Sequence, residues 1–258
     1  MAVLKPLNMH GAHFNVADPD KFRRAIQLLQ ESLFDGGATM FCADNLITWN
    51  RNLSFLRDPF FVAELQDGNT NAVEKSLVWR RYLMLYFAEL ATHAEGDFLE
   101  LGCHTGYTAL ELVRRVDLGR RGKQYYLYDL FGWQEGDAHV FMKGHEKGHA
   151  NPRMYEDVVE LFAPYPHVRV IRGSVPDSFA QGFPEKVAFA HIDMNNPTPE
   201  AGALEYLLPR LSSRGTILFD DYGWWGYSQQ KMAIDPIIAA HGLGVVELPT
   251  GQALLIKP

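Results

Sequence analysis

Cysteine and long apolar runs are the features that this chain of 258 residues most clearly lacks. Its two cysteines, Cys42 and Cys103, are too few for a disulfide framework and lack the spacing of a metal site. No run of about twenty apolar residues is present, which argues against a membrane-spanning helix. The first residues do not form an apolar signal segment either. We therefore expect a cytoplasmic protein in a reducing environment, with no membrane partner.

An excess of positive charge is also missing. The formal net charge is −7 at pH 7, which argues against a general nucleic-acid binder, because phosphate contacts need Lys and Arg. Hydrophobic residues make up 47% of the sequence and charged residues 21%, so the composition is that of an ordinary globular protein. The length fits one domain with a small appendage. The sequence leaves a homo-oligomer open.

The chain is organised around one stretch, residues 97–108. It contains an apolar strand with Glu100 near its end, a loop bracketed by Gly102 and Gly106, and the start of an amphipathic helix. Units of strand, glycine loop and helix hold nucleotide-like ligands in α/β folds. A tight turn that binds no ligand is the alternative interpretation.

The spacing of this loop indicates which ligand it takes. A dinucleotide site has Gly-x-Gly-x-x-Gly, whereas His104 stands here where the middle glycine would be. Glu100 is unfavourable for a pyrophosphate but suits a ligand with an ammonium group and no phosphate. S-adenosylmethionine (SAM) is such a ligand, and we expect it as the cofactor. A dinucleotide-dependent oxidoreductase stays as an alternative.

The order of apolar and helical patterns predicts an α/β fold. Strands and helices alternate after residue 97, which indicates a mostly parallel sheet whose last strand is antiparallel. Beyond the first strand, the expected strands are 124–129, 168–172, 187–192, 215–219, 244–248 and 253–257, and the expected helices are 154–162, 199–211 and 227–241. Residues 76–258 would form this SAM-binding domain.

Residues 1–75 are expected to form a helical N-terminal extension or cap. Asp18 begins a helix pattern that runs over residues 21–34. Aromatic and polar residues mix after it, which is typical of a packing surface or of a lid over a substrate. A long helix over residues 71–94 then leads into the first strand of the sheet.

Acidic and small polar residues fall at the carboxyl ends of the expected strands, where ligands bind in open α/β sheets. Asp129 is placed to bind the ribose hydroxyls of an adenosine. Gly173 and Ser174 are placed to contact or close over the adenine. A cap or turn role is the alternative for each of these residues.

Three further acids, Asp193, Asp220 and Asp221, need a separate explanation. With the strand order 3-2-1-4-5, the fourth and fifth strands are neighbours about 4.8 Å apart, and their ends bring three carboxylates together. Such carboxylates repel one another unless a cation lies among them. Oxygen ligands select a hard ion, Mg²⁺ or alternatively Ca²⁺ or Mn²⁺. The other interpretation is that Asp220 and Asp221 are turn residues while Asp193 binds the methionine ammonium.

From about residue 79 to residue 258 the chain resembles the macrocin-type (TylF-like) family of metal-dependent SAM O-methyltransferases. The matching motifs are Trp79-Arg80, residues 96–102, Pro176-Asp177-Ser178-Phe179, His191-Ile192-Asp193-Met194-Asn195, Leu208-Pro209-Arg210-Leu211 and Asp220-Asp221-Tyr222-Gly223.

This resemblance implies a seven-stranded, Rossmann-like class I methyltransferase sheet. It also implies transfer of a methyl group to a hydroxyl of a small molecule such as a sugar or natural product. The implied SAM contacts are Glu100, Gly102, Asp129 and Ser174, and the implied metal ligands are Asp193, Asp220 and Asp221.

The chain departs from this family at one position. The family commonly has Asp-x-Asp-x-Tyr after the fourth strand, and its second acid is a candidate general base. Asn195 stands there in this chain, and an amide does not accept a proton at neutral pH. Three alternatives stay open: the cation alone makes the hydroxyl acidic enough, His139, His145 or His149 is the base, or catalysis is lost and a SAM-binding protein remains.

Two other patterns carry secondary expectations. The run from His145 to His149 matches His-Glu-x-x-His, but Gly144, Gly148 and Pro152 argue against the helix that a zinc protease needs. We expect residues 131–151 to form a flexible lid instead.

The aromatic side chains that follow the acid pair are Tyr222, Trp224 and Trp225. They are expected either to wall the acceptor pocket or to pack in the interior, because aromatic side chains serve both roles.

Overall fold

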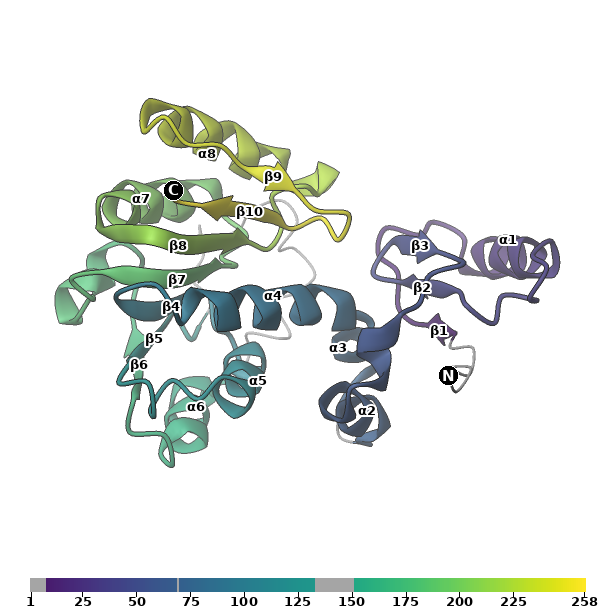
Figure 1. Ribbon diagram of the computed structural model, residues 1–258, viewed down its shortest axis with the longest axis horizontal. Helices are drawn as coiled ribbons and strands as arrows, with labels where there is room; N and C mark the ends of the chain where they lie inside the picture. Colours follow the sequence, from purple (N-terminus) through teal and green to yellow (C-terminus); the bar gives the residue numbers. More distant parts are fainter. Residues whose placement is uncertain (1–7, 69, 133–150) are drawn as a thin grey trace. The chain divides into compact units, whose positions relative to one another are not determined.

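The computed structural model describes residues 8–68, 70–132 and 151–258. The chain divides into two compact units, Met1–Tyr82 and Leu83–Pro258, and Figure 1 shows the elements of each. The sequence analysis expected the boundary after residue 75. The division falls later, inside helix α4 (Val78–Ala91).

The first unit contains a three-stranded sheet that the sequence did not predict. Strand β1 (Met9–His10) pairs in parallel with β2 (Phe41–Ala43), and β2 pairs in antiparallel fashion with β3 (Leu46–Thr48). Asp44 and Asn45 form the turn between β2 and β3, with φ values of 52° and 55°. Asp and Asn tolerate this left-handed backbone better than other residues with side chains. Strands this short are hidden from an analysis of alternating polarity.

The helix predicted over residues 21–34 is present as α1 (Pro19–Glu31). It begins earlier because the Asp18 carboxylate accepts a hydrogen bond from the Lys21 N–H at 2.9 Å, and because proline occupies its first turn. The unit also contains the short helices η1 (Ser54–Arg57) and α2 (Pro59–Gln66).

The single helix predicted over residues 71–94 is two helices, α3 (Ala72–Ser76) and α4. Helix α3 begins with a capping box, in which Asn71 and Glu74 each accept a hydrogen bond from the other's backbone N–H. The backbone leaves helical geometry at Leu77, which separates the two helices.

A buried ion pair and a group of aromatic rings hold the first unit together. The Arg80 guanidinium donates from Nε to Asp44 Oδ2 at 2.7 Å and from Nη2 to Oδ1 at 3.1 Å. Both side chains are less than a tenth exposed. Phe55 stacks on Tyr82 with ring centroids 4.6 Å apart. A two-point contact of this kind fixes the turn between β2 and β3 to helix α4.

Seven strands form the sheet of the second unit, in the order β6-β5-β4-β7-β8-β10-β9 (Figure 1). The strands are β4 (Asp97–Leu101), β5 (Tyr125–Asp129), β6 (Val168–Arg172), β7 (Val187–Ile192), β8 (Leu211–Phe219), β9 (Val246–Glu247) and β10 (Ala253–Ile256). Strands β4 to β8 pair in parallel, and β10 pairs in antiparallel fashion with β8 and β9. The predicted α/β sheet and its 3-2-1-4-5 core are confirmed.

Helices connect these strands, and they lie close to the predicted ranges. They are α5 (Tyr107–Arg115), α6 (Met154–Phe162), α7 (Pro197–Leu207) and α8 (Ser228–Ala240), with the short helices η2 (Asp177–Gln181), η3 (Leu208–Arg210) and η4 (Trp225–Tyr227).

The largest difference from the prediction concerns α7 and β8. The helix ends at Leu207 rather than 211, because Pro209 has no N–H to continue it, and the short helix η3 follows. The strand after it begins at Leu211 rather than 215. One buried cluster joins strand residues such as Leu101 and Ile192 to Leu204 of α7 and Ile234 of α8. Within the described ranges, no helix combines the length and the apolar character that crossing a membrane requires.

Strands β4 and β7 approach each other closely where they end. The Asp193 N–H donates to the Leu101 carbonyl at 2.9 Å. At Gly102, whose φ is +93°, an added Cβ would lie 1.9 Å from the Asp193 carbonyl oxygen. Glycine is required here by the approach of the two backbones, whatever ligand the loop binds.

We therefore predict that Gly102→Ala is strongly destabilising, by about 3 kcal/mol or more, because neither backbone can move away without breaking strand pairing. Gly122→Ala is the matched control, because Gly122 also has positive φ (+68°) but nothing lies within 4 Å of its added Cβ. Thermal unfolding of both variants measures the difference. Equal losses in the two variants would contradict the contact argument.

A second prediction concerns the ion pair of the first unit. Asp44→Asn keeps a residue that tolerates the turn, but it leaves the buried Arg80 guanidinium beside an uncharged amide, which costs about 3 kcal/mol. Asp20→Asn removes an ion pair with Arg23 whose side chains are 81% and 70% exposed, and we expect it to cost less than about 1 kcal/mol. Urea denaturation followed by tryptophan fluorescence compares them. Similar costs for the two variants would show that burial does not decide the strength of the Asp44 pair.

Candidate functional site

The three acids predicted to converge do so at the carboxyl edge of the sheet. Asp193 follows β7 directly, and Asp220 and Asp221 follow the neighbouring strand β8. The Asp220 N–H donates to the Ile192 carbonyl at 2.9 Å, which keeps the two strand ends in register. One carboxylate oxygen from each acid lies within 4.8 Å of the others, and all three residues are partly exposed.

The chemistry of this group fits a hard divalent cation. Its ligand atoms are carboxylate oxygens, which Mg²⁺ and Ca²⁺ prefer, and three carboxylates so close together need positive charge nearby. Partial exposure leaves a path for an ion and for water.

Asn195 lies beside these acids in a left-handed conformation with φ of 55°. Its Nδ2 is 3.4 Å from Asp193 Oδ1, a long hydrogen bond. Its Oδ1 is shielded from solvent and has no hydrogen-bond partner among the described residues. Asn195 therefore contacts Asp193 through its amide NH₂ group, while its amide oxygen is buried.

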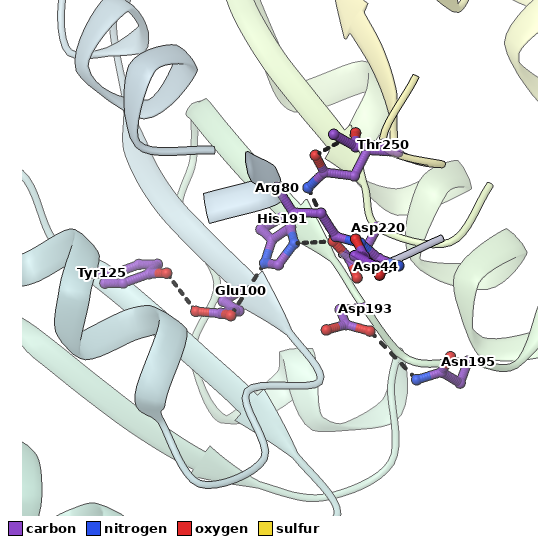
Figure 2. A network of polar contacts seen from close by, with 10 residues as sticks. Asp44, Arg80, Glu100, Tyr125, His191, Asp193, Asn195, Asp220 and Thr250 are labelled. Atoms are coloured by element: carbon purple, nitrogen blue, oxygen red, sulfur yellow. Dashed lines mark hydrogen bonds and ion pairs between the residues drawn. The ribbon is translucent and has the colours of Figure 1, made fainter. Parts of the chain in front are cut away.

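A series of polar contacts connects buried side chains of the sheet to Asp220 (Figure 2). Tyr125 donates its hydroxyl to Glu100 Oε2 at 2.6 Å. The other Glu100 oxygen lies 3.1 Å from His191 Nδ1, and His191 Nε2 lies 3.6 Å from Asp220 Oδ1. Glu100 and His191 are 1% and 3% exposed. Glu100, predicted as a cofactor contact, is thus placed inside the sheet with both oxygens engaged.

The position of His191 between two carboxylates controls its charge. Burial lowers the pKa of His191, but the interactions with Asp220 and Glu100 outweigh it and raise this pKa well above its usual value. The His191 ring therefore lies between the two carboxylates and connects strand β7 to Asp220.

Two residues of the C-terminal hairpin hold Asp220 from the other side. Gln252 Nε2 donates to Asp220 Oδ1 at 3.0 Å, and the Thr250 hydroxyl donates to Gln252 Oε1 at 3.0 Å. Gln252 and Thr250 are 1% and 3% exposed. Asp220 is oriented by these contacts, whereas the sequence analysis treated it only as an acid at the end of a strand.

Asp129, at the end of β5, accepts a hydrogen bond from the backbone of the glycine loop. Asp129 Oδ2 accepts the His104 N–H at 2.8 Å, and Oδ1 accepts the Phe131 N–H at 2.7 Å. Gly102 and Gly106 both have positive φ, and Gly106 is the N-cap of α5. Asp129 therefore connects the loop to the segment that follows β5.

Gly173 and Ser174 follow β6, the next strand along the sheet. The Gly173 N–H donates to the Asp129 carbonyl at 2.9 Å, so this strand end lies beside the end of β5. Ser174 is exposed and its carbonyl accepts the Ser178 N–H at 2.7 Å. The residues predicted to surround an adenosine thus lie on neighbouring strands.

Glu200 and Gln230 are buried polar residues that the sequence analysis did not single out. Glu200 lies in the first turn of α7 and accepts a hydrogen bond from Gln230 Nε2 of α8 at 2.6 Å. Burial and the nearby charge of Asp221 raise the pKa of Glu200 to about 8, against weaker effects of hydrogen bonds from the Asn196 and Met194 backbone and from Gln230. In the sequence, a glutamate at the start of a helix is typical of an ordinary helix N-terminus. Glu200 is distinguished from such a residue only by its burial in the structure.

The aromatic residues after the acid pair divide between the interior and the surface. Tyr222 is 4% exposed and donates its hydroxyl to Asp235, so it packs in the core. Trp225 is 93% exposed. The lid expected over 131–151, the His-Glu-x-x-His run and the histidines at 139, 145 and 149 lie largely outside the described residues.

Comparison with known proteins agrees with this architecture. Residues 99–222 match a family model described as a methyltransferase domain. No curated protein sequence matches the chain.

Several solved structures are similar. The O-methyltransferase NovP has a TM-score of 0.58 and 20% identity, covering 75% of this chain and 86% of its own. The calicheamicin methyltransferase CalS11 has a TM-score of 0.56 and 14% identity, covering 94% and 95%. An apo structure of CalS11, described as a TDP-rhamnose 3′-O-methyltransferase, has a TM-score of 0.50 and 14% identity, covering 94% and 96%. The fold is therefore that of class I methyltransferases, as the family resemblance implied, and residues 99–222 carry the sequence pattern of a methyltransferase domain.

Proposed function

We propose that this protein is a SAM-dependent methyltransferase that transfers a methyl group to a hydroxyl of a small molecule. The observation that carries the proposal is the convergence of Asp193, Asp220 and Asp221 within 4.8 Å, at the edge of a sheet that matches a methyltransferase domain. The glycine loop at the same edge supports SAM as the methyl donor.

SAM binds over this loop, between Gly102 and Gly106. Asp129 accepts the ribose hydroxyls, and it has the capacity to do so, because each oxygen now accepts one backbone N–H and a carboxylate oxygen has two lone pairs. Gly173 and Ser174 lie beside the adenosine. Glu100 contributes as a buried negative charge beneath the loop, which favours the positive charges of SAM.

The metal of the proposal is Mg²⁺, held by Asp193, Asp220 and Asp221. A divalent cation supplies a lowered pKa for the acceptor hydroxyl and fixes its position. The carboxylates of this site attract the sulfonium, and Asn195 stands beside Asp193 through its Nδ2 contact. The reacting oxygen must lie about 3 Å from the methyl carbon, in line with the departing sulfur. The methyl–sulfur bond breaks as the carbon–oxygen bond forms, S-adenosylhomocysteine leaves with the sulfur electron pair, and the hydroxyl proton passes to water at the partly exposed edge of the sheet.

The acceptor class that we propose is a sugar or natural-product-like hydroxyl. The O-methyltransferases NovP and CalS11 support this choice through the fold that they share with this chain. The chain is proposed to act as a soluble enzyme on a small molecule.

One observation favours a second candidate, a SAM-binding protein without catalysis. Asn195 is an amide that donates to Asp193, so it positions a hydroxyl without removing its proton. His191 is engaged by two carboxylates and buried, so it does not reach an acceptor.

Ligand and metal binding test the first proposal. We expect isothermal titration calorimetry to show binding of SAM and S-adenosylhomocysteine, but not of NAD or NADP. We also expect Asp193→Asn to weaken Mn²⁺ binding by about tenfold or more, because it removes a charged ligand. Asp177→Asn, an exposed acid in the same unit, is the control. Absence of SAM binding by the folded protein would contradict the proposal.

Restoring an acid next to Asp193 separates the two candidates. We predict that Asn195→Asp increases the rate of methyl transfer from labelled SAM by at least about tenfold, since a general base contributes 10²- to 10⁴-fold. Asn196→Asp is the matched control, because Asn196 caps α7 through its side-chain oxygen and Asp caps equally well. An unchanged rate in Asn195→Asp would place the base elsewhere, and no transfer in either form would favour the binding protein.

A further inference from the structure

We infer that Gln252 and Thr250, in the turn before β10, are positioning residues for Asp220: the Thr250 hydroxyl fixes the Gln252 amide, and this amide fixes the direction of the Asp220 carboxylate. The inference rests on the metal proposed for the three acids. It makes the strength of metal binding depend on two residues that lie outside the matched range 99–222 and outside the motifs of the family resemblance.

The pairing of β8 with β10 brings Gln252 to Asp220. Ala253 lies opposite Phe219 in this antiparallel pair, so the residues one step beyond, Gln252 and Asp220, continue the same register. The Leu248 N–H donates to the Gln252 carbonyl at 2.8 Å, so the backbone of Gln252 is also held within its own hairpin. Backbone pairing therefore fixes where the Gln252 side chain begins, and only the direction of its amide is left to side-chain contacts.

The direction of the Gln252 amide follows from its two partners. An ionised carboxylate only accepts hydrogen bonds, and Gln252 Nε2 donates to Asp220 Oδ1 at 3.0 Å. The amide oxygen then accepts the Thr250 hydroxyl, also at 3.0 Å. Both Gln252 and Thr250 are buried, so water does not replace either contact. The opposite orientation would place the amide oxygen against a carboxylate, and Thr250 therefore stabilises the orientation in which the amide donates to Asp220.

Two nitrogen atoms approach Asp220 Oδ1, and their distances differ. His191 Nε2 lies 3.6 Å away, beyond the usual length of a hydrogen bond, whereas Gln252 Nε2 lies 3.0 Å away. Gln252 therefore donates the hydrogen bond that sets the direction of this carboxylate. The Asp220 side chain is 14% exposed, so it can meet an ion while Oδ1 is held from within. Side chains that orient metal ligands typically change metal affinity by about 10- to 100-fold when they are replaced.

The first test is Gln252→Met, which keeps the length of the side chain but removes the donor to Asp220. We expect Mn²⁺ affinity, measured by electron paramagnetic resonance, to fall at least about tenfold, while SAM affinity, measured by calorimetry, changes less than about threefold. Gln230→Met is the matched control, because Gln230 is equally buried and also donates to a carboxylate, at 2.6 Å, but to that of Glu200. The control should lower the melting temperature and leave Mn²⁺ affinity close to that of wild type.

The second test compares Thr250→Val with Thr250→Ser and separates positioning from packing. The first variant keeps the shape of the side chain but lacks the hydroxyl, and the second keeps the hydroxyl but lacks the methyl group. We expect Mn²⁺ affinity to fall several-fold in Thr250→Val and to stay close to wild type in Thr250→Ser. A side chain that only fills space would give the reverse order, and that order would overturn the inference.

Failure of the inference and failure of the proposed function give different results. Wild-type Mn²⁺ affinity in Gln252→Met, or an equal loss of affinity in Gln230→Met, overturns the inference and leaves the proposed function intact. Wild-type protein that binds no Mn²⁺ overturns both the proposed metal and this inference. If Gln252→Met does not fold, the two Thr250 variants decide, and equal Mn²⁺ affinities in them contradict the inference.

Discussion

A histidine held between two carboxylates inside the sheet is the interaction on which the site depends. Burying a carboxylate costs several kcal/mol unless an opposite charge and hydrogen bonds compensate for it. His191 compensates Glu100 on one side and Asp220 on the other, and Tyr125 and Gln252 complete the two ends. These contacts join β5, β4 and β7 to the end of β8 and to the turn before β10, so a local rearrangement of the sheet would leave a buried polar group without its partner. This arrangement fixes Asp220 before any ligand binds.

The acids of the sheet edge consequently fall into two groups. Glu100 and Glu200 are buried and hold other residues in place, whereas Asp129, Asp193, Asp220 and Asp221 are partly exposed and can meet a ligand. The two groups differ in burial, which the structure shows. The sequence alone shows acidic residues in both groups. A preorganised group of carboxylates avoids the cost of rearrangement when a cation or a sulfonium arrives.

The sequence predicted the sheet well because a buried parallel strand leaves a strong signal, an apolar run followed by an acid. Asp193 and Asp220 could be placed together for this reason, since strand order alone decides which ends are neighbours. The engagement of Glu100 could not be predicted, because it depends on the direction of Tyr125 and His191 across strands distant in sequence. The burial of Glu200 and its contact with Gln230 could not be predicted either, because a glutamate in the first turn of a helix is common. The small sheet of the first unit escaped notice because its strands have two or three residues.

The two thiols illustrate a consequence of this burial. Cys103 lies in the glycine loop, where burial together with the charges of Asp129 and Glu100 raises the pKa of its thiol well above the usual value. Burial also raises the pKa of the Cys42 thiol to about 11. The thiolate is the form that reacts with electrophiles and oxidants, and both thiols are buried, so we expect slow modification in the folded state. Cys103 lies in the glycine loop and becomes accessible to an alkylating reagent when this loop opens. The rate of Cys103 alkylation would therefore report how often the segment proposed to hold the methyl donor opens.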